Sequence, residues 1–404
     1  MSFKEFDILI VGAGIVGLAT ARALKIAFPK SEIGVLEKES EIAYHQTGHN
    51  SGVIHSGIYY APGSQKAEFC LAGSKLLKDY CVSKNIEIDA CGKLIIATDA
   101  SEEKALNNLM ERGKSNGIKG LQFLSKNQIQ DLEPYATGSK GIYCPTTTIV
   151  DYKVVSQYFA NDCVDLGVSI IKNSEIHSIV YSDNKTLHLE TLKDTFSTKN
   201  IVNCAGLNSD RIAKMMGLDY GVKIIPFRGE YFELSENARK FVKGLIYPVP
   251  DPRFPFLGVH FTKRIDGSVE AGPNAVLSFS REGYSRFSID LIDTFETMKF
   301  PGFWKMARKN VRTAVSEQMR SLIKPIFLNS LRKLVPEISS KDLINRRAGV
   351  RAQAVDGNGK ILQDFYLIKT KNSVHVLNAP SPAATSSMAI ANHIVKTVKE
   401  SFVL

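Results

Sequence analysis

A glycine-rich motif between a strand and a helix, near the start of the chain, constrains the fold more than any other feature. Asp7–Val11 is a short, β-branched run, which is typical of a buried parallel strand. It leads into Gly12-Ala13-Gly14-Ile15-Val16-Gly17 and then into a helical stretch at 18–24. A second apolar run, 33–36, ends at Glu37, 20 residues beyond Gly17. Together these elements form a complete dinucleotide-binding fingerprint.

Each residue of this fingerprint has a physical reason. Gly12 allows the tight turn, Gly14 lets the backbone approach a pyrophosphate, and Gly17 lets the helix pack closely on the strand. Free N–H groups and the helix dipole favour an anion at the helix N-terminus. The carboxylate of Glu37 can accept hydrogen bonds from ribose hydroxyls, and its charge argues against the 2′-phosphate of NADP.

The segment after Glu37 favours FAD over NAD. Residues 38–60 are rich in glycine, serine and other polar residues, and they show little periodicity. A loop of this kind, directly after the ribose-binding acid, can wrap a long cofactor. An NAD-dependent dehydrogenase is the alternative, and it would carry no yellow chromophore.

Length and composition indicate a globular protein of two or three domains. The chain has 404 residues, of which 44% are hydrophobic and 23% charged, which excludes a disordered chain, a collagen and a coiled coil. No apolar run approaches the roughly 18 residues of a membrane span. The apolar strand follows almost directly on Met1, so we expect no leader peptide and a cytoplasmic protein.

The six cysteines indicate neither a metal site nor a disulfide framework. None of them forms Cys-x-x-Cys, and no histidine pair has the spacing of metal ligands. We therefore expect reduced, mostly buried thiols and no metal.

Several further motifs show a specific resemblance. They are His45–Tyr60, Pro62-Gly63-Ser64 with Lys66-Ala67, Asn203–Leu207, Pro226–Tyr231, Gly272–Val276, Ala348–Gln353 and Asn378–Thr385. With these motifs the chain resembles the FAD-dependent amino-acid-oxidase superfamily, and within it most closely the L-2-hydroxyglutarate dehydrogenase/oxidase family. The resemblance runs from residue 5 to about residue 398.

This resemblance, read together with the expected strands and helices, gives the fold class and its segments. We expect an α/β protein with a Rossmann-like FAD-binding domain and an interleaved α+β substrate domain on an antiparallel or mixed sheet. The FAD-binding domain would be discontinuous, with residues 1–85, 146–220 and 341–404. The substrate domain would contain residues 86–145 and 221–340, including a basic amphipathic helical segment at 295–333.

The resemblance also implies the reaction and the cofactor contacts. It implies FAD-dependent oxidation of L-2-hydroxyglutarate to 2-oxoglutarate, by hydride transfer to flavin N5 with a histidine base. An amino acid, a secondary amine or glycerol 3-phosphate is the alternative substrate. Besides Gly12, Gly14, Gly17 and Glu37, the expected cofactor-binding residues are Lys38, Thr47, Ser51, Gly52, Ala205, Gly206, Ser381, Ala383, Ala384 and Thr385.

The end of the chain suits a flavin physically as well. A strand at 374–377 and a loop lead into a helix at 386–398, which Ser386 or Ser387 could cap. A helix N-terminus aimed at the flavin pyrimidine would stabilise the negative charge of the reduced ring. The alternative is an ordinary strand–loop–helix ending.

Two histidines are the candidates for catalysis. Removing a hydroxyl proton requires a base of near-neutral pKa, which favours histidine. His55 lies in the glycine- and serine-rich loop that the resemblance places on the flavin, and His260 alternates like a strand residue that could face the pocket. Each could instead be a buried histidine with backbone partners. His45 and His49 would line the flavin loop, and nothing in the sequence demands covalent attachment there.

Two arginines are the candidates for binding a dicarboxylate. Arginine suits planar carboxylates because its donors form a fork. Arg228 and Arg351 both lie in apolar surroundings at motif positions, with Glu230 as a neighbour of Arg228. Surface solvation is the ordinary alternative for an arginine.

The net charge of +10 is concentrated in one segment. Between Phe295 and Lys333 there are nine basic and two acidic residues, a difference of +7. Phe303–Ile323 has helical periodicity, with Trp304 at its start. A basic amphipathic helix of this type fits a membrane interface, on the inner face of the cell membrane, while an interdomain helix with a solvated basic face is the alternative. The basic and aromatic residues are not interleaved elsewhere as in a nucleic-acid-binding protein, so we expect no nucleic acid. The electron acceptor could be a quinone, oxygen or an electron-transfer protein.

Overall fold

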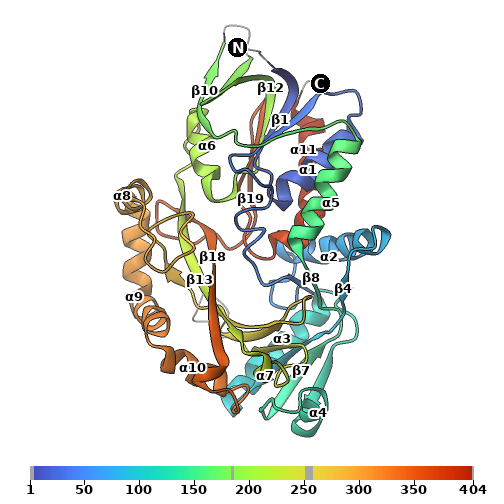
Figure 1. Cartoon of the computed structure of the whole chain (residues 1–404), viewed down its shortest axis with the longest axis vertical. Helices are drawn as coiled ribbons and strands as arrows, with labels where there is room; N and C mark the ends of the chain where they lie inside the picture. Colours follow the sequence, from blue (N-terminus) through green and yellow to red (C-terminus); the bar gives the residue numbers. More distant parts are fainter. Residues whose placement is uncertain (1–3, 183–185, 251–257, 403–404) are drawn as a thin grey trace.

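The computed structural model describes residues 4–182, 186–250 and 258–402, without the side chains of Arg312, Thr313 and Ser316. The chain forms two lobes, and its first strand and last helix both belong to the upper one (Figure 1). An eight-stranded sheet forms the upper lobe, a nine-stranded sheet the lower one, and a three-stranded sheet lies where the lobes meet.

The upper sheet has the parallel centre that the glycine motif predicts. Its parallel strands, in spatial order, are β9 (Ser169–Ile171), β2 (Ile33–Leu36), β1 (Lys4–Val11), β12 (Thr195–Asn203) and β20 (Ser373–Asn378). Antiparallel strands extend it: β10 (Ile176–Tyr181) and β11 (Leu187–Thr191) beside β12, and β19 (Tyr366–Lys369) beside β20. With β1 in the middle, the ends of β1, β2 and β12 meet at one edge of the sheet, where dinucleotides bind in such folds.

Helices cover this sheet. They are α1 (Ile15–Ala27), α2 (Gln65–Ser83), α5 (Tyr152–Asp165), α6 (Ser209–Met215), α11 (Ala383–Ser401) and the 3₁₀ turn η1 (Gly206–Asn208). α1 packs against α5 and α11, and α11 packs against α2. Ser64 caps α2 and Asp151 caps α5, which explains where these helices begin.

The lower sheet is mixed. Its strands, in spatial order, are β17 (Val276–Leu277), β13 (Val222–Leu234), β16 (Val269–Gly272), β15 (His260–Lys263), β14 (Leu245–Pro248), β5 (Lys93–Ala97), β7 (Lys140–Cys144) and β6 (Gln122–Ser125), with β18 (Leu343–Asp356) paired to β13. Among these described strands, only β14 and β5 run parallel to each other, and the other neighbouring pairs are antiparallel.

Shorter elements complete the lower lobe. The helices are α3 (Ala100–Ser115), α4 (Lys126–Leu132), α7 (Glu236–Arg239), α8 (Leu291–Lys299), α9 (Pro301–Leu322), α10 (Lys324–Arg332) and the 3₁₀ turn η2 (Ser340–Asp342). The three-stranded sheet consists of β3 (Val53–Ile54), β8 (Thr148–Val150) and β4 (Ile88–Asp89). Its strands β3 and β4 precede residues 93–144, where the chain first contributes strands to the lower sheet, and β8 follows them.

The structure confirms the expected fold class and refines some details. β18 lies in residues 341–404, which we assigned to the FAD-binding domain, yet it pairs with β13 of the lower sheet. The last helix begins at Ala383 with Pro382 as its N-cap. Ser386 and Ser387 therefore lie inside the helix and do not cap it, because the helix starts three residues earlier than its apolar periodicity indicates.

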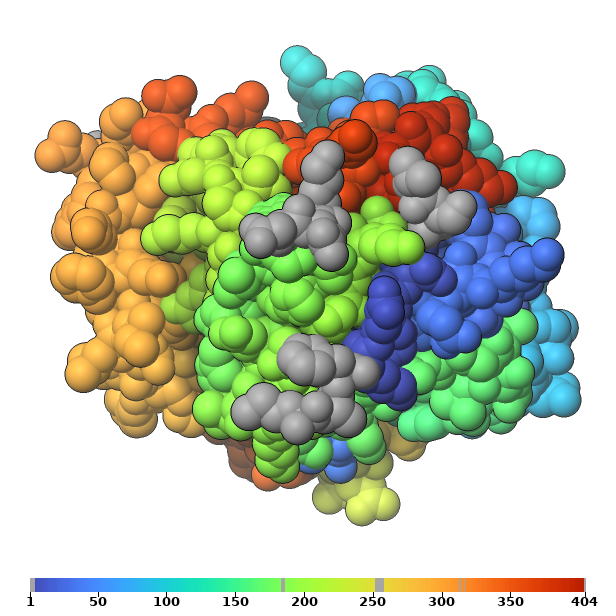
Figure 2. All heavy atoms as spheres, turned by 90° about the horizontal axis from the view of Figure 1, so that it is seen from above, coloured from blue at the N-terminus to red at the C-terminus, as the bar shows by residue number. Residues whose placement is uncertain are grey.

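The basic segment is helical, but its apolar side is only partly buried. Phe303 and Met306 pack into a small core with Ile225 and Val355. Further along, α9 changes direction at Asn310, where the backbone is not helical. A set of large apolar side chains of α8 and α9 stays exposed: Leu291, Ile292, Phe295, Met298, Trp304, Val311, Val315, Met319 and Leu322. Both helices lie along the outer edge of the lower lobe (Figures 1 and 2).

Candidate functional site

The turn between β1 and α1 requires glycine at two positions. Gly12 has a φ of +102°, and a Cβ there would lie 2.6 Å from the carbonyl oxygen of Cys204. A Cβ on Gly17 would lie 1.9 Å from the carbonyl oxygen of Gly12. No side chain caps α1 at Gly14. The first turn of this helix therefore presents N–H groups and a positive dipole end to a pocket, as a pyrophosphate requires.

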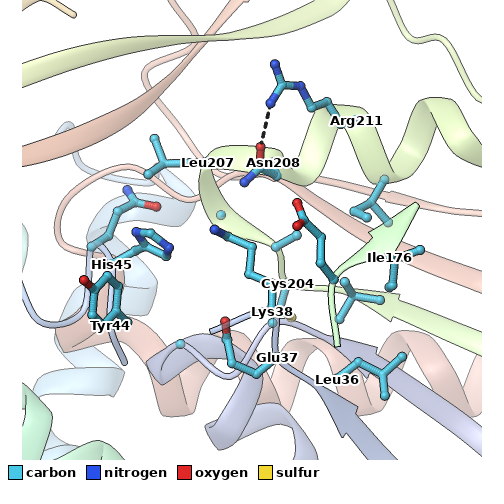
Figure 3. A pocket seen from close by; sticks show the side chains of 18 of the residues that line it. Leu36, Glu37, Lys38, Tyr44, His45, Ile176, Cys204, Leu207, Asn208 and Arg211 are labelled. Atoms are coloured by element: carbon cyan, nitrogen blue, oxygen red, sulfur yellow. Dashed lines mark hydrogen bonds between the residues drawn. The ribbon is translucent and has the colours of Figure 1, made fainter. Parts of the chain in front are cut away.

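The pocket lies at the ends of β1, β2 and β12, and Glu37 is placed in it. Figure 3 shows Glu37 and Lys38 extending from the end of β2, with Asn208 and Arg211 on the opposite side. The carboxylate of Glu37 accepts hydrogen bonds from the N–H groups of Ala13 (2.8 Å) and Glu39 (3.0 Å). These bonds fix the side chain of Glu37 at the wall of the pocket. The geometry therefore fits an adenosine ribose.

Six other predicted cofactor residues line the same pocket. They are Gly12, Gly14, Lys38, Thr47, Ala205 and Gly206. The hydroxyl of Thr47 accepts a hydrogen bond from the N–H of Ile15 at 3.0 Å, which fixes the 45–60 loop to the start of α1. Ser51 and Gly52 lie further along this loop, and Gly52 has a φ of +69°.

A lysine already neutralises two carboxylates at the pocket, those of Glu39 and Glu282. Glu39, His45 and Glu282 lie close enough together to hold a cation. The ammonium of Lys38 contacts both carboxylates at 2.6 Å, so it already supplies the positive charge. These ion pairs raise the pKa of Lys38 although burial opposes the shift.

The start of α11 meets the 45–60 loop. The hydroxyl of Thr385 accepts a hydrogen bond from the N–H of His55 at 3.1 Å. Ala383 and Ala384 are half-buried beside it, while Ser381 is exposed in the preceding loop. No side chain caps this helix, and the N–H of Ala383 donates to the carbonyl oxygen of Pro380, so the N–H groups that follow in the first turn are the ones that could face a flavin.

His55 lies in a cluster of buried polar groups below this contact. Its Nδ1 is buried and has no hydrogen-bond partner among the described residues. Burial is the main cause that lowers the pKa of His55 well below its usual value, with further contributions from Lys93, His260 and Lys66. His55 is therefore neutral near pH 7 in the free protein and able to accept a proton.

His260 belongs to the same cluster. Its ring stacks on Tyr247, with the ring centroids 3.8 Å apart. Its Nδ1 lies 2.8 Å from the carbonyl oxygen of Gly258, which assigns the proton to Nδ1 and leaves Nε2 as an acceptor. Burial lowers the pKa of His260 to about 3, so this ring stays neutral.

The β13–β18 pair separates the two predicted arginines. Phe227 is paired with Arg351, and Arg228 with Val350, so the two arginines point to opposite faces of the sheet. Arg351 shares its face with Tyr231, whose hydroxyl is its hydrogen-bond partner, and its charge acts on His260.

Arg228 is engaged on the other face. It forms a buried ion pair with Glu230 at 3.0 Å and donates to the carbonyl oxygens of Ser285 and Arg286. Glu230 in turn accepts a hydrogen bond from Ser321 of α9 at 2.7 Å. We therefore place Arg228 in the contact between the sheet and α9, away from the His55 cluster.

Lys93 is not among the site residues that the sequence predicts. This residue is 1% exposed, and its ammonium has no hydrogen-bond partner among the described residues. The only signal in the sequence is a lysine at the start of the apolar run Lys93–Ala97, where a charged group is unexpected inside a core.

The comparisons with known proteins agree with this geometry. The family model of FAD dependent oxidoreductases, DAO, matches residues 7–397. The L-2-hydroxyglutarate dehydrogenase of Indibacter alkaliphilus is 46% identical, over 98% of this chain and 100% of that protein. The human mitochondrial protein of the same name is 45% identical, over 100% of this chain and 90% of its own. The Escherichia coli K12 protein of that name is 43% identical, over 98% and 93%.

Solved structures share the fold at lower identity. L-α-glycerophosphate oxidase from Mycoplasma pneumoniae, with FAD bound, has a TM-score of 0.79 and 23% identity, covering 98% of this chain and 95% of that one. Glycine oxidase from Geobacillus kaustophilus has a TM-score of 0.73 and 16% identity, with the same coverage. Both the expected family and the FAD cofactor are confirmed. The chain belongs to the DAO family of FAD-dependent oxidoreductases, and within it to the group of full-length relatives named L-2-hydroxyglutarate dehydrogenase.

Proposed function

We propose that this enzyme oxidises L-2-hydroxyglutarate to 2-oxoglutarate. The observation that carries the proposal is the cluster of His55, His260 and Arg351, on the face of the lower sheet that meets the flavin-binding segments. It provides a base, a neutral hydrogen-bond acceptor and a cation within one partly dry site. The full-length relatives carry a name that states this substrate.

In this mechanism His55 removes the proton of the substrate hydroxyl. FAD, when bound, supplies the acceptor for the hydride that leaves C2, at N5 of the flavin. Two electrons and one proton leave as the hydride, and the second proton goes to the ring of His55. His260 accepts a hydrogen bond, and Arg351 binds a carboxylate, so that the reacting carbon is held in one orientation.

The charge of the substrate also tunes the base. A low pKa makes His55 a weak base in the free enzyme. A bound dicarboxylate brings two negative charges near the imidazole, and these raise its pKa. Substrate binding therefore prepares the base for the proton that it has to accept.

A membrane surface is part of the same proposal, through α8 and α9. The exposed apolar side chains of these helices are accompanied by exposed basic residues, among them Lys299, Lys305, Arg308 and Lys309. This combination favours a helix that lies in the interface of an anionic membrane. None of the described helices has the length and hydropathy needed to cross a bilayer. Docking at a membrane would suit a lipid-soluble quinone as the electron acceptor.

The first prediction concerns the substrate. Purified holoenzyme, mixed anaerobically with L-2-hydroxyglutarate, should lose its flavin absorbance as the cofactor is reduced. The D enantiomer, glycine, sarcosine, proline and glycerol 3-phosphate should leave the oxidised spectrum unchanged over the same time. Reduction by an amine or by glycerol 3-phosphate, but not by the hydroxy acid, would overturn the proposal.

The second prediction concerns His55 and pH. His55→Ala should slow flavin reduction by about 10²–10⁴-fold while FAD stays bound. Because the base must be unprotonated, kcat/KM of the wild type should fall only below the usual histidine pKa of about 6.5. The acid limb of kcat should lie at higher pH, since the bound substrate raises the pKa. An unchanged reduction rate in the variant, measured by stopped flow, would remove His55 from this role.

The third prediction contrasts the two arginines. Arg351→Met should raise KM for the dicarboxylate by about 10–100-fold, because a charge-assisted hydrogen bond is lost. Arg228→Met should instead lower the free energy of unfolding by about 3–5 kcal/mol, because Glu230 is left buried without its cation. Steady-state kinetics and thermal unfolding of both variants separate the two effects. The assignment fails if Arg228→Met changes KM without changing stability.

The fourth prediction concerns the membrane. The protein should sediment with vesicles that contain anionic lipid at low salt, and salt should release it. Replacing Lys305, Arg308 and Lys309 together by glutamate should abolish sedimentation, and so should a neutral vesicle. The matched control is Lys104→Glu with Lys114→Glu on α3, which should sediment like the wild type. Wild-type protein that stays in the supernatant would identify the segment as structural only.

A further inference from the structure

Lys93 is a buried charge without a counter-charge in the part of the chain that the structure describes. It begins β5 in the interior of the lower lobe, and its ammonium has no hydrogen-bond partner among the described residues. Such a group is costly to bury, because the ammonium loses its hydration and no hydrogen bond from a described residue replaces it. An anionic ligand at this position would offset the cost.

Among the described residues, no carboxylate pairs with Lys93. Its Nζ lies over the rings of Tyr59 (4.6 Å from the centroid) and Tyr247 (4.9 Å). The other ionisable groups whose charges act on it or feel its charge are Cys70 of α2, Cys144 of β7, His55 after β3 and His260 of β15. Two aromatic faces stabilise a cation only in part, so the site still attracts an anion.

Two more buried polar atoms near Lys93 also lack hydrogen-bond partners within the described ranges. They are Nδ1 of His55 and the hydroxyl of Tyr59. Tyr59 touches Lys93 through its ring, and the charge of Lys93 acts on His55. A carboxylate oxygen can accept hydrogen bonds from the ammonium and from the phenol, while the substrate hydroxyl can donate to the histidine.

The strand register places Lys93 in the substrate site. Tyr247 is paired with Ile95 in the parallel β14–β5 contact, so Lys93, two residues away, points to the same face as Tyr247. Tyr247 stacks on His260, and the charge of Arg351 acts on His260 as well. Lys93 and Arg351 therefore both act on His260 from different strands, β5 and β18, and Lys93 also acts on His55.

We propose that Lys93 binds one carboxylate of the substrate and that Arg351 binds the other. This inference rests on the proposed function and assigns it a specificity residue: the lysine–arginine pair selects a dicarboxylate over a monocarboxylic 2-hydroxy acid. Burial lowers the pKa of Lys93 to about 8. The ammonium of the free enzyme is therefore mostly charged at pH 7 and loses its proton at mildly alkaline pH.

The test uses the holoenzyme with oxidised FAD and the product 2-oxoglutarate, whose binding perturbs the flavin spectrum without turnover. Lys93→Met should weaken 2-oxoglutarate binding by about 10–100-fold. The same variant should keep or raise the melting temperature, because an unpaired buried charge is removed. Lys263→Met is the matched control: Lys263 lies on the same sheet, but its ammonium is paired with Asp89 at 2.8 Å. This control should bind 2-oxoglutarate like the wild type.

A second arm needs no variant. The dissociation constant of 2-oxoglutarate for the wild type should rise as the pH passes about 8, and Lys93→Met should show no such rise. Lys93→Met should also lose more affinity for 2-oxoglutarate than for a monocarboxylic 2-oxo acid. Equal losses for both acids would mean that Lys93 does not read the second carboxylate, and this overturns the proposal.

The remaining outcomes are also decisive. Unchanged binding in Lys93→Met, with either a raised or a lowered melting temperature, overturns the proposal, and so does a pH-independent dissociation constant. A shifted flavin reduction potential with unchanged product binding would assign the charge to the cofactor instead. If no 2-hydroxy acid reduces the wild type, the proposed function itself fails. Reduction of the wild type with no effect of Lys93→Met refutes only the role of Lys93.

Discussion

Side chains alternate between the two faces of a sheet, and in the β13–β18 pair this alternation gives neighbouring charged residues different roles. Arg351 and Tyr231 face the flavin-binding segments, whereas Arg228 and Glu230 face α9. A shift of the register by one residue would exchange the two faces. The loop of residues 45–60 approaches β18 closely, because a Cβ on Gly349 would lie 2.3 Å from the carbonyl oxygen of His49. This contact supports the register. The flavin loop and the substrate face are therefore packed together by the same strand.

The cofactor half of the site depends on a second close contact, between backbones at the start of α1. Gly17 packs against Gly12, and Gly12 against Cys204 at the end of β12. This contact brings the ends of β1, β2 and β12 to one edge of the sheet, where Glu37 is held by two backbone N–H groups. The contact of His55 with Thr385 then joins this lobe to the cluster of His55, His260 and Lys93. In the proposed arrangement, the cofactor would lie between the glycine turn and the cluster of His55, His260 and Lys93.

The sequence predicts the parts of this site that depend on local pattern. The fingerprint from Gly12 to Glu37 sits within one strand–helix–strand unit, so spacing alone indicates its structure and its ligand class. The faces of Arg228 and Arg351 depend on the pairing of strands more than 100 residues apart, which a single sequence does not reveal. Lys93 is the clearest example. In the sequence it precedes four apolar residues, which is typical of a lysine at the end of a strand that reaches solvent. Only the packing of Tyr59 and Tyr247 around it shows that its ammonium is buried.

In this proposal, membrane docking and substrate binding use different parts of the lower lobe. The end of α9 contacts the face of Arg228 and Glu230 through Ser321, while Phe303 and Met306 at its start pack against Ile225 and Val355. The exposed apolar residues of α8 and α9 lie on the outer side of the lower lobe (Figure 1). The polar groups of the His55 cluster are buried inside the molecule, so a membrane bound at the exposed side chains of α8 and α9 would not contact them. The dianionic substrate could then approach from water, away from the negative surface potential of the lipid. A surface-docked enzyme of this architecture can thus collect a charged substrate from solution while remaining next to a lipid-soluble acceptor.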